Sequence, residues 1–364
     1  MNIDLMDSPA VVIDLDVLDA NLRRTAALAD QAGIKLRPHV KTHKNVWIAR
    51  KQLEYGAVGI TVAKLGEAEV MADGGIDDIL IAYPIVGAPK LKRLANLIQR
   101  GIRVTVSVDS MEAARGLSEV GAGLGMRIPL YLDINTGLDR CGREPGESSA
   151  ELALAMAALP GIMVCGLMTH AGHAYGRPDR EGVSEVARGE AEGLIATRQV
   201  LLDRGLDVPE VSVGSTPTSK FAGQCPGVTE MRPGAYVFGD GSQLFPGLIG
   251  LSECAMRIYA TVVSAPRPGT VIVDAGSKTL SSDTSPHRRG YGYLPDYPGA
   301  YVERLSEEHG ILSVPDDCPL RIGDVVEIIP NHCCTVVNLH DELYGVHGDR
   351  VDRMLTVDAR GCVK

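Results

Sequence analysis

Short apolar segments alternate with longer amphipathic segments through the first two thirds of the chain. The apolar segments are rich in Val, Ile and Leu, a pattern typical of strands that are buried on both faces. We predict strands at residues 10–14, 35–40, 59–63, 78–83, 103–108, 127–133, 163–169 and 210–214. Helices are predicted between them, including residues 18–31, 90–100, 111–119 and 183–204. Eight strands alternating with helices favour a (β/α)8 barrel of the TIM type, with a doubly wound open sheet as the rival.

The pattern changes after Pro246. Gly, Pro and Asp turns separate further strand-like segments there, and no long helix is predicted. These strands are expected at residues 256–264, 269–274, 324–329 and 351–357. We therefore interpret residues 8–245 as the barrel and residues 246–364 as a mainly-β domain, which residues 1–7 can join.

The composition of the chain argues against some classes of binding partner. The 364 residues carry a formal net charge of −10, which argues against nucleic acid or an anionic membrane as a partner. No apolar run reaches the ~18 residues of a transmembrane helix, and the N-terminus has no basic stretch typical of a signal peptide. The eight cysteines show no framework spacing, so we expect reduced thiols and a cytoplasmic location.

The most informative segment is RPHVKTHK at residues 37–44, with Lys41 at the end of a predicted strand. A parallel barrel keeps its chemistry at that end of its strands. Two imidazoles and further cations flank Lys41, and nearby positive charge lowers the pKa of an amine, which suits a lysine that forms a Schiff base. Taken alone, such a cluster is more often a solvated surface.

Polar loops follow three later strands, at residues 135–142, 169–173 and 214–218, and residues 232–236 come soon after. The last two are rich in Gly and hydroxyl groups, as are the barrel loops that bind phosphate, although each is also compatible with an ordinary turn. Together with a strand-end lysine they favour pyridoxal phosphate (PLP), a phosphate-bearing aldehyde.

These motifs, in this order and over nearly the whole chain, resemble the alanine racemase fold, also called PLP fold type III. The resemblance implies that Lys41, His170 and Arg140 are catalytic: Lys41 would hold PLP, His170 would stack on its ring, and Arg140 would contact its phenolic oxygen. It further implies that Arg232 faces the pyridine nitrogen and keeps it unprotonated, which weakens the ring as an electron sink. The remaining cofactor-binding residues that it implies are Gly214, Ser215, Thr216, Gly234, Ala235 and Tyr236.

A second group of candidate ligands lies in the predicted β domain. His332 and Cys334 are two residues apart, so on a strand they would point to the same side, with Cys333 on the other. Imidazole and thiolate suit Zn²⁺, although buried Cys and His are more often structural. The segment resembles the metal site of the D-serine dehydratase-like subgroup, which includes D-threonine aldolases and 3-hydroxy-D-aspartate enzymes. Within it, His-x-Cys resembles dehydratases and His-x-Asp resembles aldolases, which implies Zn²⁺ or another divalent cation such as Mn²⁺.

The leading hypothesis is a PLP- and metal-dependent lyase that acts on small D-β-hydroxy amino acids. Dehydration of D-serine or D-3-hydroxyaspartate would give a 2-oxo acid and ammonia. The alternative is a D-threonine or 3-hydroxy-D-aspartate aldolase, which would give glycine or a similar product and an aldehyde. An amino-acid racemase and a noncatalytic PLP carrier rank lower, because neither explains a metal-binding β domain. The resemblance also implies a homodimer.

Overall fold

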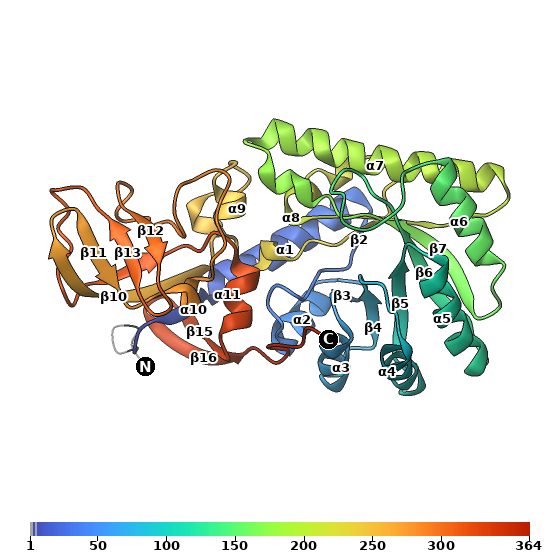
Figure 1. The fold of residues 1–364 in the computed structure, drawn as a ribbon, viewed down its shortest axis with the longest axis horizontal. Helices are drawn as coiled ribbons and strands as arrows, with labels where there is room; N and C mark the ends of the chain where they lie inside the picture. Colours follow the sequence, from blue (N-terminus) through green and yellow to red (C-terminus); the bar gives the residue numbers. More distant parts are fainter. Residues whose placement is uncertain (1–2, 4–5) are drawn as a thin grey trace.

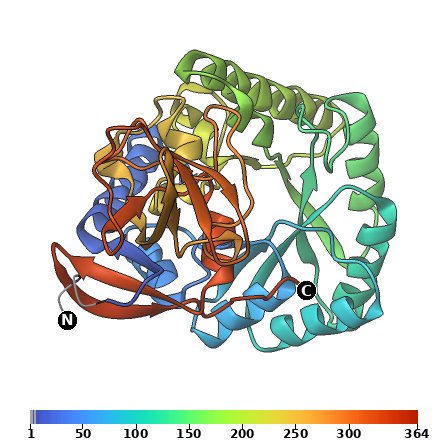
Figure 2. The same ribbon diagram turned by 60° about the vertical axis from the view of Figure 1, so that its left-hand side comes forward.

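A computed structural model of the chain describes residue 3 and residues 6–364. Two parts lie side by side along the molecule, a barrel of parallel strands and a β domain (Figure 1). Figure 2 shows the helices of residues 65–203 around the outside of the barrel strands. Among the described residues, no helix combines the length and the apolar character needed to cross a membrane.

The barrel sheet contains eight parallel strands within the described residues, in the order β2-β9-β8-β7-β6-β5-β4-β3. A bridge between His39 and Thr61 joins the segment after β2 to β3 and closes the ring. The predicted barrel is thereby confirmed. Its strands are β2 (Lys35–Leu36), β3 (Ile60–Val62), β4 (Asp78–Ile81), β5 (Arg103–Val108), β6 (Ile128–Asp133), β7 (Ile162–Met168), β8 (Glu210–Val213) and β9 (Glu230–Met231).

Helices connect the strands on the outside of the barrel, and their buried faces complete its core. The longer ones are α1 (Leu15–Ala32), α2 (Val46–Glu54), α3 (Leu65–Asp73), α4 (Ala88–Gln99), α5 (Met111–Gly123), α6 (Glu147–Ala157) and α7 (Arg180–Asp203). Shorter turns are η2 (Gly172–Gly176), α8 (Thr216–Ser219), η3 (Ala222–Gln224), η4 (Ala235–Val237), α9 (Gly241–Leu244) and η5 (Leu251–Glu253). Local signals set their ends: the Asp14 carboxylate caps the first turn of α1, and Gly33 ends the helix at φ 64°.

The strand predicted at residues 10–14 is not a barrel strand, contrary to our interpretation. β1 (Ala10–Asp14) pairs antiparallel with β10 and parallel with β15 in the sheet of the β domain. Four of its five residues are buried, with Ile13 on one face and Val12 on the other. A strand covered on both faces looks the same in either sheet, so its sequence could not reveal which sheet it joins.

The barrel completes its ring with β9, which was not predicted. β9 is two residues long, too short to produce a recognisable apolar run. It lies between β8 and β2, so the segment at residues 210–214, predicted as the eighth strand, is the seventh. Because β9 is a barrel strand, Arg232, which follows it directly, lies at the same end of the barrel as Lys41.

The β domain is built on the sheet order β12-β13-β11-β10-β1-β15-β16, with β14 paired to β10. Its remaining elements are β10 (Met256–Arg267), β11 (Thr270–Val273), α10 (Ser277–Leu280), β12 (Tyr301–Leu305), β13 (Gly310–Ser313), β14 (Val325–Ile328), α11 (Cys333–Leu339), β15 (Glu342–His347) and β16 (Arg350–Thr356). The four predicted strands correspond to β10, β11, β14 and β16. Of residues 1–7, assigned to this domain as an option, residues 1, 2, 4 and 5 lie outside the described residues.

Candidate active site

Lys41 lies just past β2 and lines three neighbouring cavities. The barrel cavity, of about 350 Å³, is lined among others by His39, Lys41, Lys64, Asp133, Arg140, His170 and Arg232. The junction cavity, of about 110 Å³, is lined among others by Lys41, Tyr175, Ser215, Thr216, Gly234, Ala235, His332 and Cys334. The outer cavity, of about 570 Å³, includes Lys41, Lys64, Ser281, Cys334 and Asn338. The candidate residues of both domains therefore meet around one amine.

The pKa of Lys41 is lowered, as predicted, but mainly by a different cause. Burial is the largest contribution, and the charges of Arg140 and Arg232 lower it further. Its cationic neighbours in the sequence are occupied elsewhere. For example, the Lys44 ammonium pairs with Glu67 at 2.7 Å. A buried amine with a lowered pKa is a better nucleophile for an aldehyde at neutral pH.

His170, which follows β7 after one residue, is fixed as a neutral imidazole. Its Nδ1 donates to the backbone oxygen of Gly214 at 2.8 Å, so Nε2 carries no proton. Burial, followed by the charges of Lys41 and Arg140, lowers the pKa of His170 to about 3. A neutral ring in the wall of the barrel cavity can stack on an aromatic cofactor.

The loop that carries Arg140 is braced by the Asn135 side chain. Its Oδ1 accepts from the N–H groups of Gly137 and Asp139, both at 3.1 Å, and its Nδ2 donates to Asp139 Oδ1 at 2.8 Å. This loop brings the exposed Arg140 to the barrel cavity, which the buried Arg232 also lines. Two guanidinium groups thus reach one cavity from different strands.

The junction cavity is lined by Ser215, Thr216, Gly234 and Ala235, whereas Gly214 lines the neighbouring barrel cavity. The N–H groups of Gly234 and Ala235 both point to the Thr216 hydroxyl, at 3.0 and 2.9 Å. Gly214 has a φ of +144°, and a Cβ there would lie 2.9 Å from the backbone of Arg232. Convergent N–H groups and hydroxyls in so small a space fit a phosphate.

Tyr236 differs from the other predicted cofactor residues. Its hydroxyl accepts a hydrogen bond from Gln52 at 2.9 Å, in the interior behind the cavities. It is not among the residues that line the three cavities. Its side chain supports the wall next to Ala235.

His332 and Cys334 do lie together, but not on a strand as predicted. His332 is the residue before α11, and Cys334 belongs to the first turn of that helix. A hydrogen bond from Cys333 and the charge of His332 lower the pKa of the Cys334 thiol, so its thiolate is favoured. Cys334 Sγ also lies 3.1 Å from the Thr42 hydroxyl, one residue after Lys41. Cys333 is fully buried in the core of the β domain, where its side chain contacts Cys334 and Asp240.

Asp240 holds His332 from behind, and sequence reasoning missed it. Its Oδ2 lies 3.4 Å from His332 Nδ1 and accepts from the backbone N–H of Cys333 at 2.9 Å. With Nδ1 directed to a carboxylate, Nε2 is left for a metal, an arrangement common to histidine ligands. Asp240 is distant in sequence from His332, so no local spacing could have indicated it.

Family comparisons agree with this arrangement. Residues 13–242 match the family model described as alanine racemase, N-terminal domain, and residues 255–346 match a putative serine dehydratase domain. The chain therefore belongs to the family whose members combine an alanine racemase N-terminal domain with a serine dehydratase domain. A D-threo-3-hydroxyaspartate dehydratase from Delftia sp. is 36% identical, over 90% of this chain and 91% of that protein. A D-threonine aldolase from Arthrobacter sp. is 33% identical, over 98% and 92%.

Solved structures of family members superpose closely. A D-threonine aldolase from Filomicrobium marinum matches with a TM-score of 0.91 at 35% identity, covering 99% of this chain and 97% of that one. A D-threo-3-hydroxyaspartate dehydratase variant with a cysteine replaced by alanine, described as a metal-free form, matches with a TM-score of 0.90 at 32% identity, with 98% of both chains covered. The family members named here are lyases, and so is this chain.

PLP is the cofactor expected of this family, and the residues present fit it. The barrel cavity supplies an amine at Lys41, a neutral ring at His170 and a guanidinium at Arg232, and the junction cavity supplies the phosphate cradle. A Cβ at Gly234 would lie 2.7 Å from the Thr42 hydroxyl, so this close approach requires glycine.

The chain also offers two donors for a metal ion. Within residues 3 and 6–364, no cluster of three or more His, Cys, Asp or Glu side chains could hold a metal. His332 and Cys334 both line the junction cavity, where they are two potential donors. Tyr175, also missed from the sequence, lines the same cavity with its ring 6.2 Å from that of His332. Its proximity in sequence to His170 was the available signal.

Proposed function

We propose that this lyase uses PLP and a divalent cation to dehydrate a D-β-hydroxy amino acid to a 2-oxo acid and ammonia. D-3-hydroxyaspartate and D-serine are the first candidates, because relatives are named for both. The observation that carries the proposal is the His332–Cys334 pair beside Lys41. A cation held by this pair would lie close to Lys41, within reach of a substrate hydroxyl.

The chain's own residues would divide the work as follows. Bound PLP supplies an electron sink for the substrate α-carbon. Lys41 holds the cofactor and then, through Nζ, accepts the α-proton. His332 and Cys334 hold Zn²⁺ or Mn²⁺, which supplies Lewis-acid assistance to departure of the β-hydroxyl. Tyr175 and Thr42 restrict the space around the pair.

Aldol cleavage is the second candidate, because D-threonine aldolases are nearly as similar to this chain. Cleavage breaks the Cα–Cβ bond, whereas dehydration leaves it intact, so the products distinguish the two reactions. The softer thiolate ligand, in place of the carboxylate typical of aldolases, favours dehydration. The homodimer and the cytoplasmic location stay predictions.

Lys64 is the residue that we propose to select a substrate with a second carboxylate. It follows β3 and lines both the barrel cavity and the outer cavity, next to Lys41. Its ammonium lies 3.6 Å from the centre of the Tyr83 ring, which supports the side chain without a strong ion pair. By contrast, Lys278 pairs with Glu307 and Glu308 outside the three cavities.

A substrate panel tests the proposed function. The enzyme is supplied with PLP and Zn²⁺ and given D-3-hydroxyaspartate, D-serine and D-threonine in parallel, with 2-oxo acid, ammonia, glycine and aldehyde all measured. We expect 2-oxo acid and ammonia in equal amounts, with the highest kcat/KM for D-3-hydroxyaspartate. Lys64→Met should raise KM about tenfold or more for that substrate, because one charged hydrogen bond is lost, and should leave D-serine nearly unchanged. Glycine and aldehyde as the main products would show that the chain is an aldolase.

A further inference from the structure

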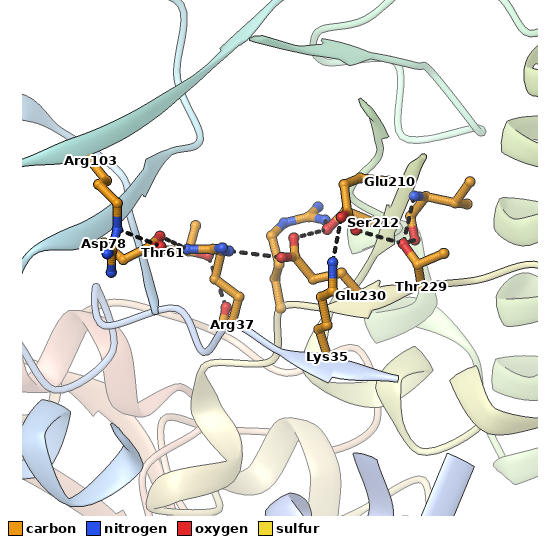
Figure 3. A network of polar contacts seen from close by, with 11 residues as sticks. Lys35, Arg37, Thr61, Asp78, Arg103, Glu210, Ser212, Thr229 and Glu230 are labelled. Atoms are coloured by element: carbon orange, nitrogen blue, oxygen red, sulfur yellow. Dashed lines mark hydrogen bonds and ion pairs between the residues drawn. The ribbon is translucent and has the colours of Figure 1, made fainter. Parts of the chain in front are cut away.

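A chain of polar contacts joins Asp78, Arg37, Glu230 and Ser212 (Figure 3). Arg232 donates to Ser212 at the end of this chain. Glu230 and Arg232 are two residues apart, and Ser212 on the neighbouring strand β8 is in register with Glu230 on β9. The exposed fractions of Ser212 and Glu230 are both 0%. Barrel interiors are usually filled by Val, Ile and Leu in this layer, so an isolated carboxylate here is costly unless it is fully paired.

The hydrogen bonds have only one consistent direction. Arg232 has no acceptor, so it donates to the Ser212 hydroxyl and also to the backbone oxygen of Thr169. Ser212 has a single proton, which it must therefore donate to Glu230 Oε1, at 2.6 Å. The other carboxylate oxygen, Oε2, accepts from Arg37 Nε at 2.8 Å. Both oxygens of Glu230 are thus occupied by donors.

Arg37 links this group to the outside of the barrel. Its second donor, Nη1, reaches Asp78 on β4, which is paired in turn with the exposed Arg103. Glu230 therefore lies between two guanidinium groups: it pairs with Arg37 directly and reaches Arg232 through Ser212. Burial lowers the pKa of Arg232, and Glu230 is the largest of the nearby charges that raise it again.

We infer that Glu230 and Ser212 are positioning residues, which hold the Arg232 guanidinium in place and in its charged form against the pyridine nitrogen of the cofactor. The inference rests on the proposed function, because it needs PLP on Lys41. Two of the guanidinium's donors are held from below, so its remaining N–H groups have a fixed direction toward the cavities that it lines. The relay formed by Glu230, Ser212 and Arg232 thereby sets how strongly the cofactor ring withdraws electrons, and neither Glu230 nor Ser212 contacts the substrate.

The test compares both ends of the polar chain in the PLP-loaded enzyme. Ser212→Ala removes the link to Arg232. Asp78→Asn weakens the outer ion pairs with Arg37 and Arg103 but leaves the hydrogen bonds of Ser212 in place, so it is the matched control. The readout is the ¹⁵N chemical shift of the pyridine nitrogen in labelled PLP, together with kcat and KM. For Ser212→Ala we expect the ¹⁵N signal to shift toward the value of a protonated ring. We also expect kcat to be about tenfold lower, because one buried charged hydrogen bond is lost, and KM to change little. Asp78→Asn should leave both the chemical shift and kcat unchanged.

Arg232→Ala separates failure of the relay from failure of the proposed function. It should move the ¹⁵N signal, and adding Ser212→Ala to it should produce no further change, because the relay acts through Arg232. If Arg232→Ala moves the signal but Ser212→Ala alone does not, the relay is wrong while the cofactor site stands. If wild-type enzyme binds no PLP at Lys41, or Arg232→Ala has no effect on the signal, the cofactor assignment and the relay both fail.

Discussion

Burial sets the protonation of the side chains around Lys41 more strongly than their sequence neighbours do. Burial is the largest cause of the lowered pKa of Lys41, of His170 and of His39. The motif at residues 37–44 indicated a lysine with a lowered pKa, but for a reason that is only partly correct. Its other charges are paired with carboxylates that lie far away in the sequence, and such partners become visible only in the fold.

His43 allows this effect of burial to be measured away from the cavities. Burial lowers the pKa of His43 to about 4, from an ordinary value of 6.5. Below pH 6.5 the unfolded chain binds a proton at His43, whereas the folded chain does not until the pH approaches 4. The contribution of neutral His43 to the free energy of unfolding is therefore complete above pH 6.5 and is lost as the pH falls toward 4. Between pH 7 and pH 4.5 the loss should be about 2 kcal/mol. We expect that the free energy of unfolding of His43→Gln, measured with urea on the cofactor-free protein, falls by about that much less than the free energy of the wild type over the same pH range. An equal fall in both proteins would contradict this prediction.

At the scale of elements, sequence patterns identified most strands and helices but not their partners. β1 was predicted but assigned to the wrong sheet, because the sequence of a strand buried on both faces does not indicate which strands pair with it. β9 was missed because two residues make no pattern. The candidate ligands at residues 332 and 334 line one cavity, although the segment is not the expected strand. The first turn of α11 also brings them together and directs Cys333 inward.

The geometry of α11 predicts different roles for its two adjacent thiols. Cys333 packs in the β-domain core with Val336 and Val337, so Cys333→Ala should lower the free energy of unfolding by about 1 kcal/mol and leave the bound metal in place. Cys334→Ala should do the reverse, with lost metal and nearly unchanged stability. Urea unfolding and elemental analysis of the purified variants measure both quantities. Loss of metal from Cys333→Ala alone would overturn the assignment.

At the scale of the whole molecule, the site is assembled where the two parts of the chain meet. The barrel supplies Lys41, and α11 of the β domain brings Cys334 to 3.1 Å from Thr42, which follows Lys41 in the chain. Family motifs indicated the candidate residues of both parts, and these residues line adjoining cavities. Asp240, Tyr175 and Lys64 were missed, because their importance comes from packing between segments that are far apart in the sequence.

The central claim is that the barrel holds PLP while the β domain holds the metal that promotes departure of the substrate hydroxyl. The most direct test is to remove the metal from the yellow holoenzyme with EDTA and follow both the visible absorption of the cofactor and 2-oxo acid formation. The account predicts that absorption stays, that activity falls about a hundredfold or more, since a Lewis acid contributes several kcal/mol, and that Zn²⁺ or Mn²⁺ restores it. Full activity in enzyme shown by elemental analysis to be free of metal would contradict the account.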